Sequence, residues 1–151
     1  MLNPTVADFS VPATNGQTFT LSAQRGKKVV LYFYPKDSTP GCTTQAQGFR
    51  DLQAEFIAAG AVVVGVSRDS LKSHENFKLK QSLNFELLSD SEEILCQQFD
   101  VIKQKKMYGK EVRGIERSTF LIDPNGVLRQ EWRKVKVDGH VPEVLAAVKA
   151  L

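Results

Sequence analysis

The stretch that decides the fold is Tyr34-Pro-Lys-Asp-Ser-Thr-Pro-Gly-Cys42-Thr-Thr-Gln45, which lies between an apolar run and an amphipathic segment. The apolar run, residues 29–34, is typical of a buried strand. In the segment that follows, apolar side chains recur at the three-and-four spacing of one helical face: Ala46, Phe49, Leu52, Phe56 and Ala59. The sequence therefore predicts a strand, a tight turn and a helix in this order.

Cys42 is the residue in this stretch that carries distinctive chemistry. It lies four residues before Ala46, so we expect its side chain on the inward face of the first helical turn. Unpaired backbone N–H groups and the positive end of the helix dipole stabilise a thiolate at such a position. Taken alone, Cys42 is interpreted equally well as an inert buried thiol. The residues around Cys42 are needed to distinguish a reactive thiolate from an inert buried thiol.

Length and composition favour one globular domain spanning residues 1–151. The chain has 151 residues, 42% of them hydrophobic, which is enough to bury a substantial core. We find neither the pattern of a signal peptide nor an apolar run of membrane-spanning length, and therefore expect a cytoplasmic enzyme without a membrane partner. Two cysteines, Cys42 and Cys96, are too few for a disulfide scaffold.

The charge distribution gives a mild basic excess. The formal net charge is +3, and basic residues gather at 103–106 and 133–136. A solvated face explains these clusters better than a nucleic-acid patch, because no aromatic residues are interleaved with them. We therefore expect no nucleic-acid partner.

Strand and helix signals alternate along the chain. Helices are expected at 42–59, 71–81, from Asp90 or Ser91 to Phe99, and 141–150. Gly60 suits a helix end, and the turn at 123–126 joins a terminal hairpin. Strands are expected at 17–21, 28–34, 61–67, 85–88, 118–122 and 127–132. This alternation predicts an α/β sandwich with a mixed central sheet flanked by helices.

Several motifs now support a family resemblance. The pattern Pro35-x-x-x-Thr39-x-x-Cys42 resembles the signature of peroxiredoxins, and its longer form resembles the peroxiredoxin Q, or bacterioferritin comigratory protein, branch. The resemblance covers nearly the whole chain. Further matches are Ala7-Asp8-Phe9, Gly65-Val-Ser67, Leu87-Leu-Ser-Asp90, Tyr108-Gly-Lys110 and Gly114-Ile-Glu-Arg117-Ser-Thr-Phe-Leu-Ile-Asp123.

The resemblance implies a thioredoxin-like fold and thiol-dependent reduction of hydrogen peroxide and organic hydroperoxides, with no cofactor. Cys42 would attack a peroxide oxygen and become a sulfenic acid. The Thr39 hydroxyl would accept a hydrogen bond from the peroxide and donate one to the sulfur. Arg117 would stabilise the thiolate and the charge that moves between the oxygens.

The same resemblance assigns supporting roles to three neighbours. The backbone N–H groups of Gly41 and Cys42 would hold a peroxide oxygen at the helix end. Pro35 would shield the pocket from water. Gln45 stands where the family often has Glu; it keeps the hydrogen-bonding shape and loses the charge.

Each of these residues also has an ordinary structural interpretation. Arg117 alone would be a surface residue paired with Glu116, Thr39 alone a helix cap, and Pro35 alone a strand terminator.

The chain departs from the family pattern at the second cysteine. Relatives carry that resolving cysteine five residues after the first or on the following helix, and here these positions are Gln47 and Lys78. Cys96 is expected on the flank of a buried helix face, half-buried, where it is either structural or a resolving thiol. A one-cysteine mechanism is the default, with an external thiol such as thioredoxin, glutaredoxin or glutathione as reductant.

Three other classes of function compete with this interpretation. A thioredoxin-type reductase needs Cys-x-x-Cys, and the sequence from Cys42 to Gln45 lacks the second sulfur. A metal site built from Cys42, Cys96, His74 and His140 has no recognised ligand spacing, and we expect both histidines to face solvent. We therefore expect no metal. A non-catalytic binding or chaperone module remains an alternative. We expect a monomer.

Overall fold

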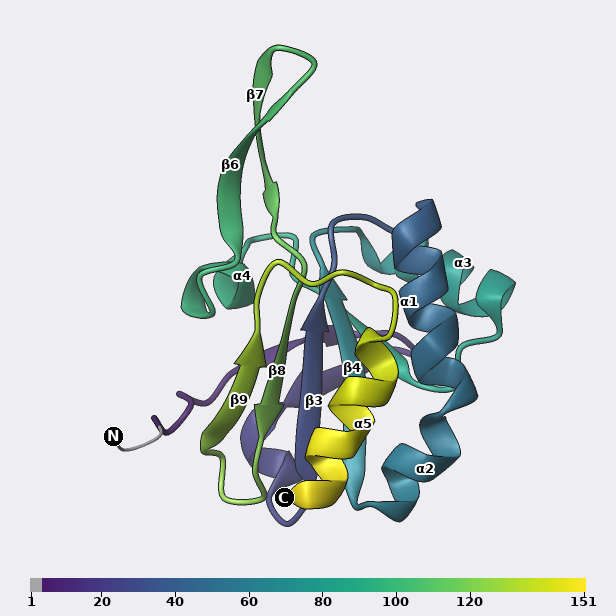
Figure 1. Ribbon diagram of the computed structural model, residues 1–151, viewed down its shortest axis with the longest axis vertical. Helices are drawn as coiled ribbons and strands as arrows, with labels where there is room; N and C mark the ends of the chain where they lie inside the picture. The colour runs from purple at the N-terminus through teal and green to yellow at the C-terminus, as the bar shows by residue number, and fades with distance from the viewer. Residues whose placement is uncertain (1–3) are drawn as a thin grey trace.

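The computed structural model describes residues 4–151, except the side chains of Lys105 and Met107. Its centre is a seven-stranded mixed sheet in the order β2-β1-β5-β4-β3-β8-β9 (Figure 1). The three inner strands β3, β4 and β5 are parallel, and the others pair antiparallel. This confirms the predicted α/β fold with a mixed sheet. The strands are β1 (Ser10–Ala13), β2 (Gln17–Thr20), β3 (Lys28–Phe33), β4 (Ala61–Ser67), β5 (Glu86–Ser89), β8 (Ser118–Ile122) and β9 (Leu128–Trp132).

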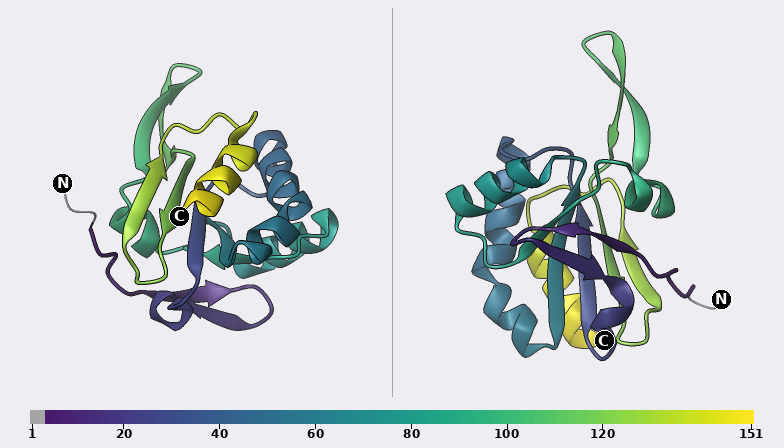
Figure 2. Two further views of the ribbon diagram at one scale, coloured as in Figure 1. Left: turned by 60° about the horizontal axis from the view of Figure 1, so that its bottom comes forward. Right: turned by 180° about the vertical axis from the view of Figure 1, so that it is seen from behind.

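Helices cover both faces of the sheet. Four of them lie on one face: α1 (Pro40–Asp51), α2 (Gln53–Ala58), α3 (Leu71–Gln81) and α5 (His140–Ala150). The short helices η1 (Leu21–Gln24) and α4 (Ile94–Gln98) contribute to the other face, as the view from behind in Figure 2 shows. None of the helices within residues 4–151 is long and apolar enough to cross a membrane.

Strand β3 divides the hydrophobic core into two clusters. Successive side chains of a strand point to opposite faces of the sheet. Val30 and Tyr32 therefore pack under the four larger helices. Val29 and Leu31 pack with α4 on the other side. The two clusters therefore lie on opposite faces of the sheet.

The predicted helix over residues 42–59 forms two helices. The chain bends at Leu52, which ends α1 and precedes α2. Pro40 occupies the first turn, where its missing N–H costs nothing, so the helix begins earlier than predicted. Gly60 follows the second helix with a φ of +79°, a conformation that favours glycine, as predicted for the helix end.

Two β-hairpins were not predicted from the sequence. In one of them, β1 pairs with β2 through a turn at Asn15 and Gly16. The other is a separate hairpin whose turn holds Tyr108 and Gly109 at φ values of 54° and 77°, as a tight hairpin turn requires. Its strands carry mainly charged and polar side chains, so no apolar alternation marked them. The hairpin consists of β6 (Ile102–Met107) and β7 (Lys110–Ile115), and it projects beyond the sheet in Figure 1.

The parallel strands position the candidate site. Because β3, β4 and β5 run in the same direction, their carboxyl ends meet at one edge of the sheet. The segments that follow these three strands carry Tyr34 to Cys42, Asp69 and Asp90, respectively. The hairpin projects from this same end of the molecule (Figure 1).

Candidate active site

Cys42 lies in the first turn of α1, directly after the loop that leaves β3. Its side chain is only 2% exposed and packs in the cluster that contains Tyr32, Tyr34 and Ala46. This confirms the inward orientation predicted from the helical spacing. The first N–H groups of a helix have no intrahelical acceptor, so Gly41 and Cys42 offer free backbone donors beside the sulfur.

Arg117 brings a positive charge to this sulfur from a distant part of the sequence. It lies between β7 and β8, and its Nη2 donates to Cys42 Sγ over 3.4 Å. Its Nη1 donates to Gln45 Oε1 over 2.6 Å, which fixes the guanidinium plane. Gln45 is fully buried, and its Nε2 has no hydrogen-bond partner among the described residues. A guanidinium donor favours the anionic form of the sulfur that it faces.

Gly41 permits this close approach. A Cβ at this position would lie 3.2 Å from Arg117 Nη2, a distance that few real Cβ contacts reach. Because hydrogen bonds to Gln45 and Cys42 hold the guanidinium, it has little freedom to withdraw. The structure thus places Gly41, Gln45, Cys42 and Arg117 together.

Thr39 differs from expectation in its hydrogen bonding. It occupies the N-cap position of α1, but its hydroxyl donates to the Lys36 carbonyl over 2.8 Å. A hydroxyl has one proton, so in this conformation Thr39 does not donate to Cys42. Its lone pairs remain available to accept a hydrogen bond.

Pro35 is exposed and borders a cleft of about 530 Å³ beside Arg117. This cleft also touches the base of the hairpin. Its remaining lining residues are Lys103, Gln104, Glu116, Lys134 and Val135.

Cys96 lies on the opposite face of the sheet from Cys42. It packs with Leu31 and Phe33, and it is fully buried, so the prediction of a half-buried flank position was wrong. Ile94 of the same helix is exposed, so the buried face of α4 is formed by Leu95 and Cys96. Burial, together with the nearby Asp90 carboxylate, raises the pKa of the Cys96 thiol well above its usual range.

Both histidines were also wrongly predicted to face solvent. His140 is buried at the start of α5, where its Nε2 lies 2.8 Å from the Thr119 hydroxyl. Burial lowers the pKa of His140. His74 is fully buried near the start of α3. Their local sequence did not reveal that Asp37 contacts His74, or that Thr119 and Trp132 pack against His140.

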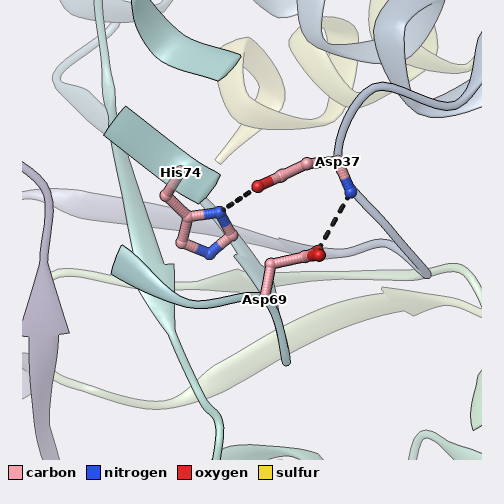
Figure 3. A group of neighbouring side chains, drawn as sticks. All are labelled: Asp37, Asp69 and His74. Atoms are coloured by element: carbon pink, nitrogen blue, oxygen red, sulfur yellow. Dashed lines mark hydrogen bonds and ion pairs between the residues drawn. The ribbon is translucent and has the colours of Figure 1, made fainter. Parts of the chain in front are cut away.

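His74 belongs to a buried polar cluster that sequence reasoning missed. Ligand-type atoms of Asp37, Asp69 and His74 lie within 4.8 Å of one another (Figure 3). These atoms are already engaged: Asp37 Oδ2 with His74, Asp69 Oδ2 with the Asp37 N–H, and His74 Nε2 with the Leu88 carbonyl. We therefore interpret the cluster as a hydrogen-bond network. The available signal was that Asp37 and Asp69 each follow one of two neighbouring parallel strands.

Comparisons with known proteins agree with this architecture. The model of the AhpC/TSA family matches residues 3–131. Peroxiredoxin Bcp of Xanthomonas campestris is 58% identical over 95% of this chain and 89% of its own length. Peroxiredoxin Bcp of Bacillus subtilis is 54% identical over 94% of this chain and 90% of its own length.

A solved structure of a related protein has the same fold. The bacterioferritin comigratory protein of Xanthomonas campestris, described for its alkyl peroxide reduction activity, superposes with a TM-score of 0.90. It is 57% identical, and the match covers 94% of this chain and 90% of that one. The fold, with a cysteine at the start of the helix after β3, is that of a thioredoxin-like thiol protein. The chain belongs to the AhpC/TSA family of peroxiredoxins and is a thiol peroxidase.

Proposed function

We propose that this enzyme reduces hydrogen peroxide and organic hydroperoxides at Cys42. The observation that carries the proposal is the contact between Arg117 Nη2 and Cys42 Sγ at the start of a helix. A guanidinium, free backbone N–H groups and the helix dipole all stabilise negative charge at this point. The alkyl peroxide reduction described for the Xanthomonas relative supports organic hydroperoxides as one substrate class.

The first chemical step is a displacement at oxygen. The Cys42 thiolate attacks one oxygen of ROOH, an S–O bond forms and the O–O bond breaks. The sulfur is oxidised to a sulfenic acid, and the leaving RO⁻ takes a proton to give ROH or water. Arg117 and the N–H groups of Gly41 and Cys42 face the oxygens while charge moves from sulfur to the leaving oxygen. The lone pairs of the Thr39 hydroxyl accept the hydrogen bond of the bound peroxide.

The cleft beside Arg117 fits the remainder of an organic substrate. Pro35 lines this cleft and limits the water that reaches the reacting atoms, and Lys103 and Lys134 line it as well. Hydrogen peroxide needs none of this space. The cleft therefore supports turnover of peroxides larger than hydrogen peroxide.

We further propose that an external thiol completes the cycle. The thiol attacks the sulfenic acid sulfur to give a mixed disulfide and water, and a second thiol then releases Cys42 as the thiolate. Thioredoxin, glutaredoxin and glutathione all supply this chemistry. The position of Cys96 supports the one-cysteine mechanism, because the sheet separates it from Cys42. A disulfide requires Cα atoms within about 7 Å of each other.

The cellular setting is also proposed. Two buried free cysteines suit a reducing compartment such as the cytoplasm. Among the described residues, the exposed large apolar side chains are distributed over α2, α3, α4 and the hairpin and are not gathered on one element. This distribution supports a monomer.

The test is peroxide decay in the presence of dithiothreitol, comparing the wild type with Cys42→Ser and with Cys96→Ser. We expect Cys42→Ser to lose activity and Cys96→Ser to keep it. Peptide mapping after one equivalent of peroxide should find a sulfenic acid at Cys42. A stoichiometric disulfide between Cys42 and Cys96 would establish the two-cysteine mechanism instead. Normal turnover by Cys42→Ser would show that Cys42 is not the nucleophile.

A further inference from the structure

The loop between β3 and α1 is fastened to the protein by a buried carboxylate. Asp37 is 5% exposed, and its carboxylate receives hydrogen bonds from three side chains. The Tyr34 hydroxyl donates to Oδ1 over 2.6 Å. The Ser73 hydroxyl donates to Oδ2 over 2.8 Å, and His74 Nδ1 lies 2.7 Å from the same oxygen. Two of these partners come from α3, so the network ties the loop to that helix.

His74 also connects the Asp37 carboxylate to β5. Its Nε2 lies 2.9 Å from the Leu88 carbonyl, so both ring nitrogens face hydrogen-bond acceptors. The ring thus links the loop after β3 both to α3, which carries it, and to β5. Burial raises the pKa of Asp37, but the hydrogen bonds from His74, Tyr34 and Ser73 together hold this pKa below its usual range.

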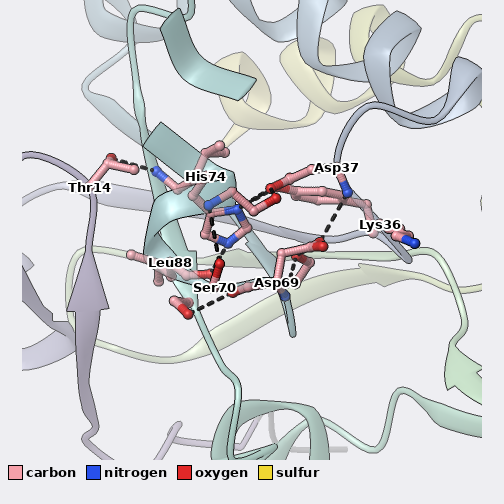
Figure 4. Close-up of polar contacts among 12 residues, drawn as sticks. Thr14, Lys36, Asp37, Asp69, Ser70, His74 and Leu88 are labelled. Atoms are coloured by element: carbon pink, nitrogen blue, oxygen red, sulfur yellow. Dashed lines mark hydrogen bonds and ion pairs between the residues drawn. The ribbon is translucent and has the colours of Figure 1, made fainter. Parts of the chain in front are cut away.

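The backbone of the same loop is fixed as well. The Asp37 N–H donates to Asp69 Oδ2 over 3.0 Å, and the Ser67 hydroxyl donates to that carboxylate oxygen too. Figure 4 shows that the loop, the end of β4, the start of α3 and β5 meet through these contacts. Ser38, the next residue, has a φ of 62°, which is uncommon for a residue other than glycine. The surrounding contacts hold the loop in this unfavourable conformation.

With the loop closed, an external thiol cannot reach the Cys42 sulfur. Cys42 follows Asp37 by five residues, and its side chain is 2% exposed. A peroxide is small enough to reach a buried sulfur, whereas a protein or peptide thiol is not. Reduction by an external thiol therefore requires the loop and the first turn of α1 to open. Thr43 and Thr44, poor helix formers, lie in that turn.

We propose that Asp37 and His74 are positioning residues that hold the loop closed and thereby set the balance between two forms. The closed form, with Arg117 against Cys42, reacts with peroxide; the opened form exposes the oxidised Cys42 to an external thiol. Neither residue contacts Cys42. The inference concerns the role of this residue pair, and it rests on the proposed function, since its readouts are the two half-reactions of Cys42.

The principal test is Asp37→Asn, measured separately in each half-reaction. Stopped-flow mixing with hydrogen peroxide should show slower oxidation of Cys42, by roughly tenfold, a mid-range value for the loss of one buried pair interaction. Reduction of the pre-formed sulfenic acid by glutathione should become faster. The fraction over-oxidised to sulfinic acid per turnover should fall, because the opened form leaves the peroxide site.

Two further variants separate positioning from general destabilisation. Ser73→Ala removes one hydrogen bond to Asp37 without leaving a buried charge unpaired, and it should change both rates in the same directions by a smaller factor. It carries the test if Asp37→Asn does not fold. Ser70→Ala is the matched control, because Ser70 caps α3 through the Ser73 N–H and does not contact Asp37. We expect it to lower the melting temperature while leaving the ratio of the two rates unchanged.

The inference is overturned if Asp37→Asn and Ser73→Ala leave both rates unchanged, or if both half-reactions slow by the same factor. A separate readout avoids dependence on peroxidase activity. Labelling of reduced Cys42 by a bulky maleimide, located by peptide mapping, should be faster in both variants than in the wild type. If the wild type consumes no peroxide, the proposed function fails, while this labelling still tests whether the pair holds the loop closed.

Discussion

Replacing Arg117 by alanine is the most direct test of how the site stabilises charge. The Nη2–Sγ distance of 3.4 Å corresponds to an attraction of about 5 kcal/mol between unit charges at an effective dielectric constant near 20. Arg117 is half-buried, and water entering the vacated space recovers part of this energy. A hydrogen bond to a charged group contributes about 1.5 to 3 kcal/mol by mutation. We therefore expect a loss of about 1.4 to 4 kcal/mol, or roughly ten- to thousandfold in the rate of peroxide attack.

Stopped-flow oxidation by hydrogen peroxide measures this rate, and alkylation of Cys42 as a function of pH measures the thiolate population. The alkylation profile of Arg117→Ala should move to higher pH. Arg117→Lys should recover only part of the rate, since an ammonium lacks the planar fork that contacts Gln45 and Cys42 together.

Arg113→Ala is the matched control, because Arg113 lies on β7, only four residues before Arg117, and pairs with Glu93 instead of Cys42. It should leave both measurements unchanged. If Arg117→Ala also changes neither the attack rate nor the alkylation profile, the electrostatic reasoning is refuted.

Four further outcomes are expected. Cys42→Ser should lose at least about 99% of peroxide turnover with a normal circular dichroism spectrum, because a serine hydroxyl does not ionise near neutral pH. Gly41→Ala should slow peroxide attack measured by stopped flow by roughly tenfold, because the added methyl group displaces the guanidinium of Arg117. Cys96→Ser should keep turnover with dithiothreitol within about twofold, since the sheet separates this residue from the reacting sulfur. Hydrogen bonds from two arginines lower the pKa of Glu93 from 4.5 to about 2. The ionised carboxylate therefore stabilises the fold fully above pH 4.5, and this contribution is lost as the pH falls toward 2. Across this range the melting temperature of Glu93→Gln should decline less steeply than that of the wild type.

The sequence by itself determined the fold class and the chemistry. The apolar run before Tyr34 and the helical spacing after Cys42 are local signals. The strand and the helix that they predicted are present, although the helix is divided in two at Leu52. Local spacing also predicted the buried orientation of Cys42, because side-chain direction within one helix follows from its period alone. The motif around Cys42, together with the segment around Arg117, is sufficient to indicate the peroxiredoxin family.

Only the tertiary structure decided which distant residues meet and which remain apart. Arg117 and Cys42 are 75 positions apart, and the pairing of β3 with β8 brings them within hydrogen-bond distance. Asp37 and His74 meet because the loops after parallel strands converge at one sheet edge. Cys96 and Cys42 remain apart because they belong to the clusters on opposite faces of the sheet, to which alternate residues of β3 contribute. Burial and pairing of these groups depend on how whole layers pack together, and no local pattern in the chain encodes that arrangement.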